Sequence, residues 1–329
     1  MSAPKPKVTI VGLGEIGGSI GLALRQADVV SAVVGHDKEV SVAKAAKKLG
    51  AVDQTDWNLI SACEDSDLVI LSIPFGDIEP TLKALGSYLR PGCVLMDTAT
   101  LKEPVLAWAD EILPDEIHFV GSNPVIVQSV EGQGGLESAR VDLFQNGLFC
   151  LTPSPKADPK AVKLATDLIT ILGAKPVFFD AAEHDGMMAG VEHLPPILAL
   201  SLLEVVTRQP SWRDMRRVAG GAFGAATYLP AGEPIAYGDL IQANRDNVLR
   251  WLDAFSASLA SVRQLVAEGE PEAIAEHFNT VLEERERWMQ DRASGNWEGD
   301  RQELPEKPNI LRDAFLGGLG RKRPQKKEE

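Results

Sequence analysis

The length, composition and charge of the chain limit what it can be. The sequence has 329 residues, of which 44% are hydrophobic and 24% are charged, as in a soluble globular protein with one large or two moderate domains. Its formal net charge of -14 disfavours nucleic acid and anionic membranes as partners. We therefore expect a small-molecule substrate, and neither a nucleic-acid nor a membrane partner.

The cysteines and the apolar segments indicate the cellular compartment of the protein. Cys63, Cys93 and Cys150 are widely spaced, which fits neither a disulfide framework nor the spacing of metal ligands, so no metal site is expected. No run of about 20 apolar residues is found, and no long apolar segment precedes the first predicted strand. The sequence therefore predicts a cytoplasmic protein without a signal peptide or a membrane span.

Short apolar runs alternate with helical patterns over residues 1–180, which we interpret as one α/β domain. Strands are predicted at 7–14, 31–37, 66–74, 92–100, 117–124, 147–153 and 175–180, and helices at 17–27, 39–50, 77–90 and 158–173. Strands that alternate with helices of this length predict a doubly wound parallel sheet, as in Rossmann-like folds.

The pattern becomes wholly helical after residue 180. Helical spacing is found at 185–207, 237–269 and 271–292, so residues 181–295 are predicted to form an all-helical domain. The 185–207 stretch has few charges on any face, and we expect it to be buried in a core or against a partner subunit. Residues 296–329 are predicted to be a charged C-terminal tail.

A glycine motif follows the first strand and opens the first helix. Gly12, Gly14 and Gly17 form Gly-x-Gly-x-x-Gly, and this context gives the motif its meaning. Gly12 permits the tight turn, Gly14 lets a pyrophosphate approach, and Gly17 allows close packing of helix on strand. The N–H groups at the start of the helix, near Glu15 and Ile16, would face the phosphates. The sequence therefore predicts a dinucleotide cofactor.

Other candidate cofactor residues follow from their places at strand ends. Asp37 ends the second strand, where a carboxylate binds the adenosine ribose hydroxyls and repels a 2′-phosphate, so NAD is favoured over NADP. In a doubly wound sheet, ligands lie at the carboxyl ends of the strands. The later strands contribute Ser72, Ile73, Pro74, Asp97 and Thr98.

With these motifs, the sequence resembles the prephenate and arogenate dehydrogenase family over residues 7–291. The likeness lies in VGLGEIGGSIGLALR, DLFQNGLFCLTP, DAAEHDGMMAGVEHLPPILA and GDLIQANRDNVLRWLDAF. The resemblance implies a Rossmann-like domain, a helical dimerisation domain, and a site between them. It also implies oxidation of a cyclohexadienol with NAD or NADP in tyrosine biosynthesis. Hydride leaves the ring carbon that bears the hydroxyl, the ring carboxylate leaves as carbon dioxide, and the ring becomes aromatic.

The chain departs from the family pattern where the resemblance places the chemistry. Asn123, in GSNPVIV, stands where the family has a histidine, and an amide cannot take a proton near neutral pH. Thr100 replaces a serine in ATLK, in which Lys102 is retained. In HLPP, His193 is retained and Pro196 replaces a second histidine. The resemblance thus makes Asn123, Lys102, His193 and Thr100 the catalytic candidates.

Two further replacements affect the binding of a substrate carboxylate. Gly224 and Tyr228 occupy positions where the family has arginines, and neither residue can form a bidentate pair with a carboxylate.

Several polar residues also have structural interpretations. His193 can be a core histidine, and Lys102 can pair with a carboxylate at the surface. His184 and Asp185 are predicted to cap the first helix of the second domain. Asn244 and Arg245 are predicted to lie on the polar face of a helix.

Three hypotheses stay open from the sequence. The chain can be a prephenate or arogenate dehydrogenase with a divergent pocket. It can be a related NAD(P)-linked oxidoreductase that acts on a different, less anionic substrate. It can also be a dimer that binds the nucleotide without catalysis.

Overall fold

The computed structural model describes residues 5–126, 134–229 and 234–295. By its internal contacts the chain divides after Pro271, so helix α13 (Pro271–Ser294) is described by itself. The predicted tail at 296–329 lies outside the described residues.

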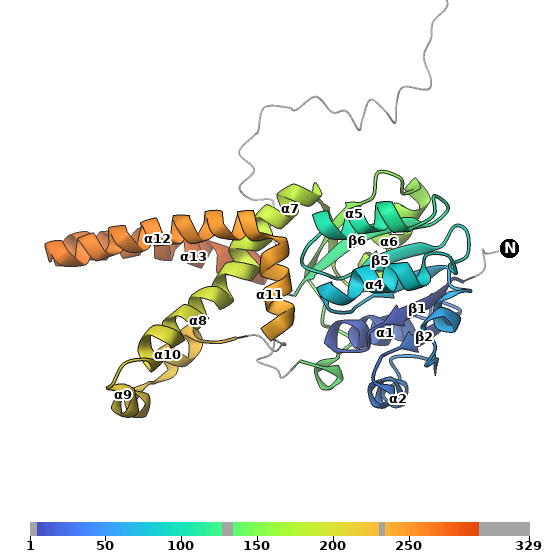
Figure 1. Cartoon of the computed structure of the whole chain (residues 1–329), viewed down its shortest axis with the longest axis horizontal. Helices are drawn as coiled ribbons and strands as arrows, with labels where there is room; N and C mark the ends of the chain where they lie inside the picture. Colours follow the sequence, from blue (N-terminus) through green and yellow to red (C-terminus); the bar gives the residue numbers. More distant parts are fainter. Residues whose placement is uncertain (1–4, 127–133, 230–233, 296–329) are drawn as a thin grey trace, which may run out of the picture. The chain divides into compact units, whose positions relative to one another are not determined.

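One eight-stranded sheet, in the order β3-β2-β1-β4-β5-β6-β7-β8, organises the first part of the chain (Figure 1). Its strands are β1 (Lys7–Val11), β2 (Ala32–His36), β3 (Gln54–Thr55), β4 (Leu68–Leu71), β5 (Val94–Asp97), β6 (His118–Val125), β7 (Leu148–Pro153) and β8 (Lys175–Phe178). The paired strands are parallel except β6 and β7, which are antiparallel. The predicted parallel, doubly wound sheet is thus confirmed except at this pair, which as an antiparallel pair needs no crossover helix.

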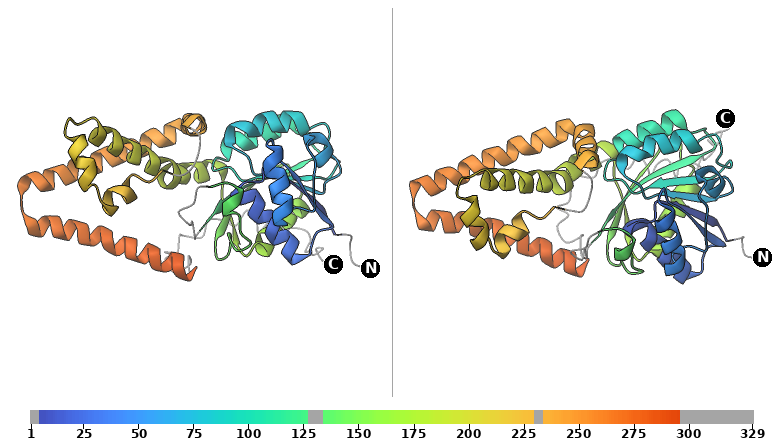
Figure 2. Two further views of the ribbon diagram at one scale, coloured as in Figure 1. Left: turned by 90° about the horizontal axis from the view of Figure 1, so that it is seen from below. Right: turned by 60° about the horizontal axis from the view of Figure 1, so that its bottom comes forward.

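Helices cover both faces of the sheet and enclose two cores (Figure 2). One face carries α1 (Glu15–Ala27), α2 (Val40–Leu49) and α6 (Pro159–Ile171), and the other carries α3 (Leu59–Cys63), α4 (Phe75–Leu85) and α5 (Glu103–Ile112). Successive strand residues point to opposite faces, so Ile70 lies in one core and Val69 and Leu71 in the other. This confirms the Rossmann-like prediction, although α3, α5 and the short β3 were not predicted.

The described residues after 180 are helical, as predicted. The helices are α7 (Ala181–Met188), α8 (Leu194–Thr207), α9 (Trp212–Val218), α10 (Gly221–Ala226), α11 (Pro234–Ala243) and α12 (Arg245–Glu268). A π-helical turn, Ala189–His193, joins α7 to α8. Pro195 and Pro196 follow it, and because proline has no backbone N–H, the regular hydrogen-bond ladder cannot continue through this point.

Helix Ala181–Thr207 is apolar, and the chain's own core covers only part of it. By length and composition alone it could cross a membrane, although the core helix of a soluble protein can have the same length and composition. Its first turns carry the buried polar side chains of His184, Asp185 and His193, which hydrocarbon would not solvate. Farther along, α8 exposes apolar residues that include Leu200 and Val205. The core therefore covers this helix only in part, and its burial against a partner subunit stays a prediction.

Candidate active site

A cavity of about 470 Å³ lies at the carboxyl ends of β1, β2 and β4, where the sequence places the dinucleotide. Of the predicted cofactor residues, those that line it are Gly12, Gly14, Asp37, Ser72, Ile73 and Pro74. Its other lining residues are Val11, His36, Lys38, Leu59, Asp77, Pro80, Thr81 and Ala84. Four of these, Asp77, Pro80, Thr81 and Ala84, belong to α4, and only the helical pattern of this stretch is visible in the sequence.

The three glycines have distinct steric surroundings that fit a bound pyrophosphate. Gly12 has φ +89°, and an added Cβ would overlap the carbonyl oxygen of Ser72. An added Cβ on Gly17 would overlap the carbonyl oxygen of Gly12, which shows how closely α1 packs on the turn. By contrast, Gly14 has no such neighbour within 4 Å. Gly14 thus leaves open space in the cavity where the motif requires a phosphate to approach.

The start of α1 and the end of β2 supply the polar groups of this cavity. No side chain caps α1, so the N–H groups of its first turn, near Glu15 and Ile16, can bind a phosphate. The Asp37 carboxylate accepts hydrogen bonds from the Leu13 N–H at 2.8 Å and the Glu39 N–H at 2.9 Å. These bonds fix the carboxylate while its other lone pairs can accept from ribose hydroxyls.

Asp97 and Thr98 lie outside the residues that line the cavity. Asp97 is fully buried and forms an ion pair with Lys102, which is also fully buried. The Asp97 carboxylate also accepts from the Ser122 N–H at 3.1 Å. The Thr98 N–H donates to the Leu71 carbonyl at 3.1 Å. The contact of both residues with the cofactor stays a prediction.

Lys102 holds two strands together from the interior of the protein. Its Nζ binds Asp97 at the end of β5 and donates to the Ser122 carbonyl on β6 at 2.8 Å. Burial lowers the pKa of Lys102, and the neighbouring Asp97 carboxylate opposes this shift. The interpretation of Lys102 as a surface ion pair is therefore wrong. Through its bond to the Ser122 carbonyl, Lys102 positions the strand residue that immediately precedes Asn123.

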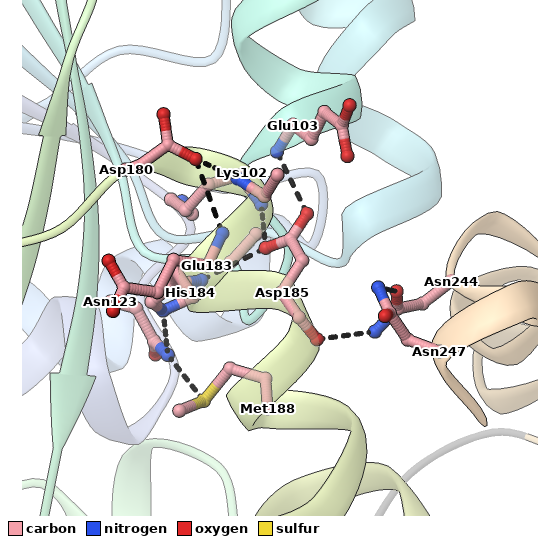
Figure 3. A network of polar contacts seen from close by, with 12 residues as sticks. Lys102, Glu103, Asn123, Asp180, Glu183, His184, Asp185, Met188, Asn244 and Asn247 are labelled. Carbon is pink, nitrogen blue, oxygen red and sulfur yellow. Dashed lines mark hydrogen bonds and ion pairs between the residues drawn. The ribbon is translucent and has the colours of Figure 1, made fainter. Parts of the chain in front are cut away.

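Asn123 lies in a buried polar network that joins β6 to α7 (Figure 3). Its Nδ2 lies 3.2 Å from His184 Nε2 and 3.3 Å from Met188 Sδ. His184 Nδ1 lies 2.9 Å from Asp185 Oδ1. The network therefore runs from the position of the family histidine to a His–Asp pair on the neighbouring helix.

Asp185 caps a helix of the first domain rather than its own helix. Its carboxylate accepts from the N–H groups of Lys102 at 2.8 Å and Glu103 at 2.9 Å, which begin α5. Helix α7 is capped by Asp180, which accepts from the N–H of Ala182 at 3.0 Å. The predicted capping role of His184 and Asp185 in α7 is therefore wrong.

Asn244 connects the network to the helical part of the chain. It lies at the break between α11 and α12, so its predicted place on a helix face is wrong. Its Nδ2 lies 2.9 Å from the Asp185 carbonyl oxygen and 3.3 Å from His193 Nδ1. The neighbouring Arg245 is exposed, and its guanidinium lies 3.3 Å from the Asp246 carboxylate. Arg245 and Asp246 both line a second cavity of about 370 Å³.

His193 is buried with one ring nitrogen unsatisfied. Asn244 donates to Nδ1, so Nε2 carries the proton of the neutral ring, and Nε2 has no hydrogen-bond partner within the described residues. Burial lowers the pKa of His193 to about 4, and the Asp185 charge opposes this shift. Both interpretations of His193, as a core histidine and as a substrate contact, agree with an unpaired N–H in this position.

The burial of neutral His193 makes stability depend on pH. Its pKa of about 4 in the folded chain lies below the ordinary value of 6.5, so between these values the unfolded chain binds more protons. Stability is therefore fully present above pH 6.5 and is lost as pH falls. From pH 7.5 to 5.0, the unfolding free energy from urea titration should fall by about 2 kcal/mol more in the native chain than in His193→Asn. Equal losses would contradict this assignment.

The remaining candidates from the sequence lie outside this network. Thr100 is half-buried in the segment between β5 and α5. Gly224, in α10, and Tyr228, which follows it, are exposed in the single chain. Burial raises the pKa of Tyr237, and Tyr228 and Glu192 add to this shift. The two arginine positions of the family are therefore occupied by residues that bring no positive charge to this region.

The doubly wound sheet and its glycine-lined cavity define a dinucleotide-binding protein. Family models identify it further: "Prephenate dehydrogenase, nucleotide-binding domain" matches residues 20–178, and "Prephenate dehydrogenase, dimerization domain" matches residues 180–280. The chain belongs to the prephenate dehydrogenase family, whose members are NAD-dependent dehydrogenases.

Individual relatives agree with this assignment. The chain is 29% identical to prephenate dehydrogenase of Bacillus subtilis, over 87% of this chain and 77% of the relative. It is 28% identical to cyclohexadienyl dehydrogenase of Zymomonas mobilis, over 82% of this chain and 92% of the relative. The structure of Aquifex aeolicus prephenate dehydrogenase with hydroxyphenyl propionate and NAD+ matches with a TM-score of 0.79 and 26% identity, over 87% of this chain and 99% of that chain.

Proposed function

We propose that the chain oxidises a cyclohexadienol, prephenate or arogenate, with NAD+ and with loss of carbon dioxide, in tyrosine biosynthesis. The observation that carries this proposal is a contact at the junction of the two domains. There the family's histidine position, Asn123, contacts His184 of the DAAEHDGMMAG stretch at 3.2 Å. The glycines and Asp37 form a cavity that fits the dinucleotide at the same edge of the sheet.

The residues of the chain have separable roles in this reaction. Bound NAD+ supplies the hydride acceptor. Gly12, Gly14 and the first turn of α1 bind the pyrophosphate, and Asp37 orients the adenosine ribose. Asn123 binds the substrate hydroxyl as a hydrogen-bond acceptor, and Lys102 holds the strand that carries Asn123.

A turnover assay tests this function. Purified chain is mixed with NAD+ and separately with prephenate and arogenate, and NADH is followed by its absorbance. We expect NADH and carbon dioxide to form in equal amounts with at least one of the two substrates. If a preparation that binds NADH turns over neither substrate, the proposed function is rejected.

A less anionic substrate is the second candidate. It is favoured by Gly224 and Tyr228 at the arginine positions and by the proximity of Glu192 to Tyr237. The double substitution Asn123→His with Gly224→Arg tests it. Prephenate turnover in the double variant but not in the native chain would support a different native substrate. Efficient prephenate turnover by the native chain would reject this candidate.

NAD is the preferred cofactor because Asp37 would lie against a 2′-phosphate. We expect NADH to bind at least about tenfold more tightly than NADPH, as judged by nicotinamide fluorescence. Asp37→Ser should weaken NADH binding and reduce the preference to about twofold, because Lys38 remains in the cavity lining. Equal affinities in the native chain would contradict the preference.

The enzyme acts as a cytoplasmic homodimer through its helical domain. The dimerisation-domain match and the apolar residues exposed on α8, including Leu200 and Val205, support the dimer. Cys63, Cys93 and Cys150 are free and buried, which suits a reducing compartment. Light scattering after size exclusion tests the dimer, and a monomer at micromolar concentration would reject it.

A further inference from the structure

The Asp185 carboxylate determines how the Asn123 amide is oriented. A carboxylate only accepts hydrogen bonds, so His184 Nδ1, 2.9 Å from Asp185 Oδ1, must carry the imidazole proton. Nε2 of the neutral ring is then an acceptor. The Asn123 atom that faces Nε2 at 3.2 Å must therefore be the donor Nδ2, as Figure 3 shows.

The amide nitrogen of Asn123 is fully occupied, whereas its oxygen is available. One N–H of Nδ2 points to His184 Nε2 and the other to Met188 Sδ, at 3.3 Å. Within the described part of the chain, no group donates to Oδ1, and this atom is not sealed from solvent as His193 Nε2 is. Asn123 therefore presents one free hydrogen-bond acceptor in a fixed orientation.

We propose that His184, held by Asp185, is a positioning residue that directs Asn123 Oδ1 toward the ring hydroxyl of the substrate. Oδ1 accepts the hydrogen bond of this hydroxyl and takes no proton. The inference rests on the proposed function and explains how the chain works with an amide where its family has a histidine.

The electron balance of the reaction allows an acceptor that cannot be protonated. The C–H electron pair leaves the hydroxyl-bearing carbon as hydride and reduces the oxidised nicotinamide. The electron pair between the ring and its carboxylate stays in the ring as carbon dioxide departs, and the ring becomes aromatic. The hydroxyl keeps its proton throughout and becomes the phenol O–H of the product. As positive character grows on the carbon, this O–H becomes more acidic and its bond to Oδ1 strengthens.

Binding of two product-like acids tests the geometry independently of turnover. The probes are 4-hydroxyphenylpropionate and 3-phenylpropionate, which differ only in the hydroxyl, and the full chain is saturated with NAD+. We expect calorimetry to show that the hydroxylated acid binds about tenfold more tightly, as one hydrogen bond predicts. His184→Leu should reduce this ratio below about twofold and leave the affinity for 3-phenylpropionate unchanged.

His184→Gln is the matched control, because its Oε1 can accept from Asn123 Nδ2 and should preserve most of the tenfold ratio. A structural role of His184 alone would weaken both acids equally, and an unchanged ratio in His184→Leu would overturn the proposal. If the leucine variant does not fold, the proposal is tested by NMR of the Asn123 side-chain amide in the native chain. This signal is assigned by its absence from the spectrum of Asn123→Asp. The hydroxylated acid should shift this signal more than 3-phenylpropionate does, and equal shifts would overturn the proposal.

The two proposals fail in different ways. An absence of prephenate and arogenate turnover in the native chain rejects the proposed function. Turnover in the native chain, combined with a ligand ratio that His184→Leu does not change, rejects only the role of His184.

Discussion

Replacing Lys102 by methionine should lower the free energy of unfolding by about 3–5 kcal/mol, because the substitution leaves Asp97 as an unpaired buried carboxylate. Both side chains are fully buried, and Lys102 also donates to the Ser122 carbonyl at 2.8 Å, which would lose this donor. Methionine has a similar volume, so the loss of the ion pair outweighs any change in packing. Urea titration of the native chain and Lys102→Met measures the difference.

The double variant Lys102→Met with Asp97→Asn is the matched control. An uncharged amide at position 97 can still accept from the Ser122 N–H, and no charge is then left without a partner. We expect the double variant to regain at least half of the stability that Lys102→Met loses. A loss below about 1 kcal/mol in Lys102→Met would instead mean that water reaches Asp97 and solvates it.

The cofactor part of the site was predictable because its residues are close in sequence and act through the backbone. Gly12 and Gly14 adjoin a strand end and a helix start, and this order of elements defines the motif without knowledge of distant contacts. Asp37 was predictable in the same way, because it follows the second strand of the same β–α–β unit. The sheet itself followed from alternating apolar and helical patterns, whose period does not depend on tertiary packing.

The polar network was not predictable because its contacts join residues far apart in sequence. Asn123 and His184 are 61 positions apart, and Lys102 and Asp185 are 83 apart. Its sequence position predicts that Asp185 caps its own helix, whereas its carboxylate caps α5 instead. The signals in the sequence were the family resemblance, which marked Asn123, Lys102 and His193 one by one, and the polar cluster EHD in a largely apolar helix, because such residues are rarely buried without partners.

The fold around Asn123 holds this residue rigidly. The antiparallel pair of β6 and β7 places Asn123 opposite Cys150, inside the sheet rather than on a loop. Strand pairing fixes its backbone, Lys102 fixes the preceding carbonyl, and His184 fixes its amide. A neutral acceptor in a rigid setting can stabilise a developing partial charge without reorganisation during the reaction.

Gly12→Ala and Gly14→Ala should separate folding from cofactor binding at the glycine turn. Gly12 has φ +89°, and its added Cβ would overlap the Ser72 carbonyl oxygen, so Gly12→Ala should lose at least about 2 kcal/mol of unfolding free energy. Gly14 has φ -73° and open space around its Cβ position. Gly14→Ala should therefore change stability by about 1 kcal/mol or less.

Both alanine variants should bind NADH at least about 100-fold more weakly than the native chain, for different physical reasons. In Gly12→Ala the turn is displaced, whereas in Gly14→Ala the new methyl group occupies the space that the pyrophosphate needs. Urea titration without cofactor and fluorescence titration with NADH measure the two effects separately. Native-like NADH affinity in Gly14→Ala would show that the pyrophosphate does not approach this glycine, and the cofactor would then have to be placed elsewhere in the cavity.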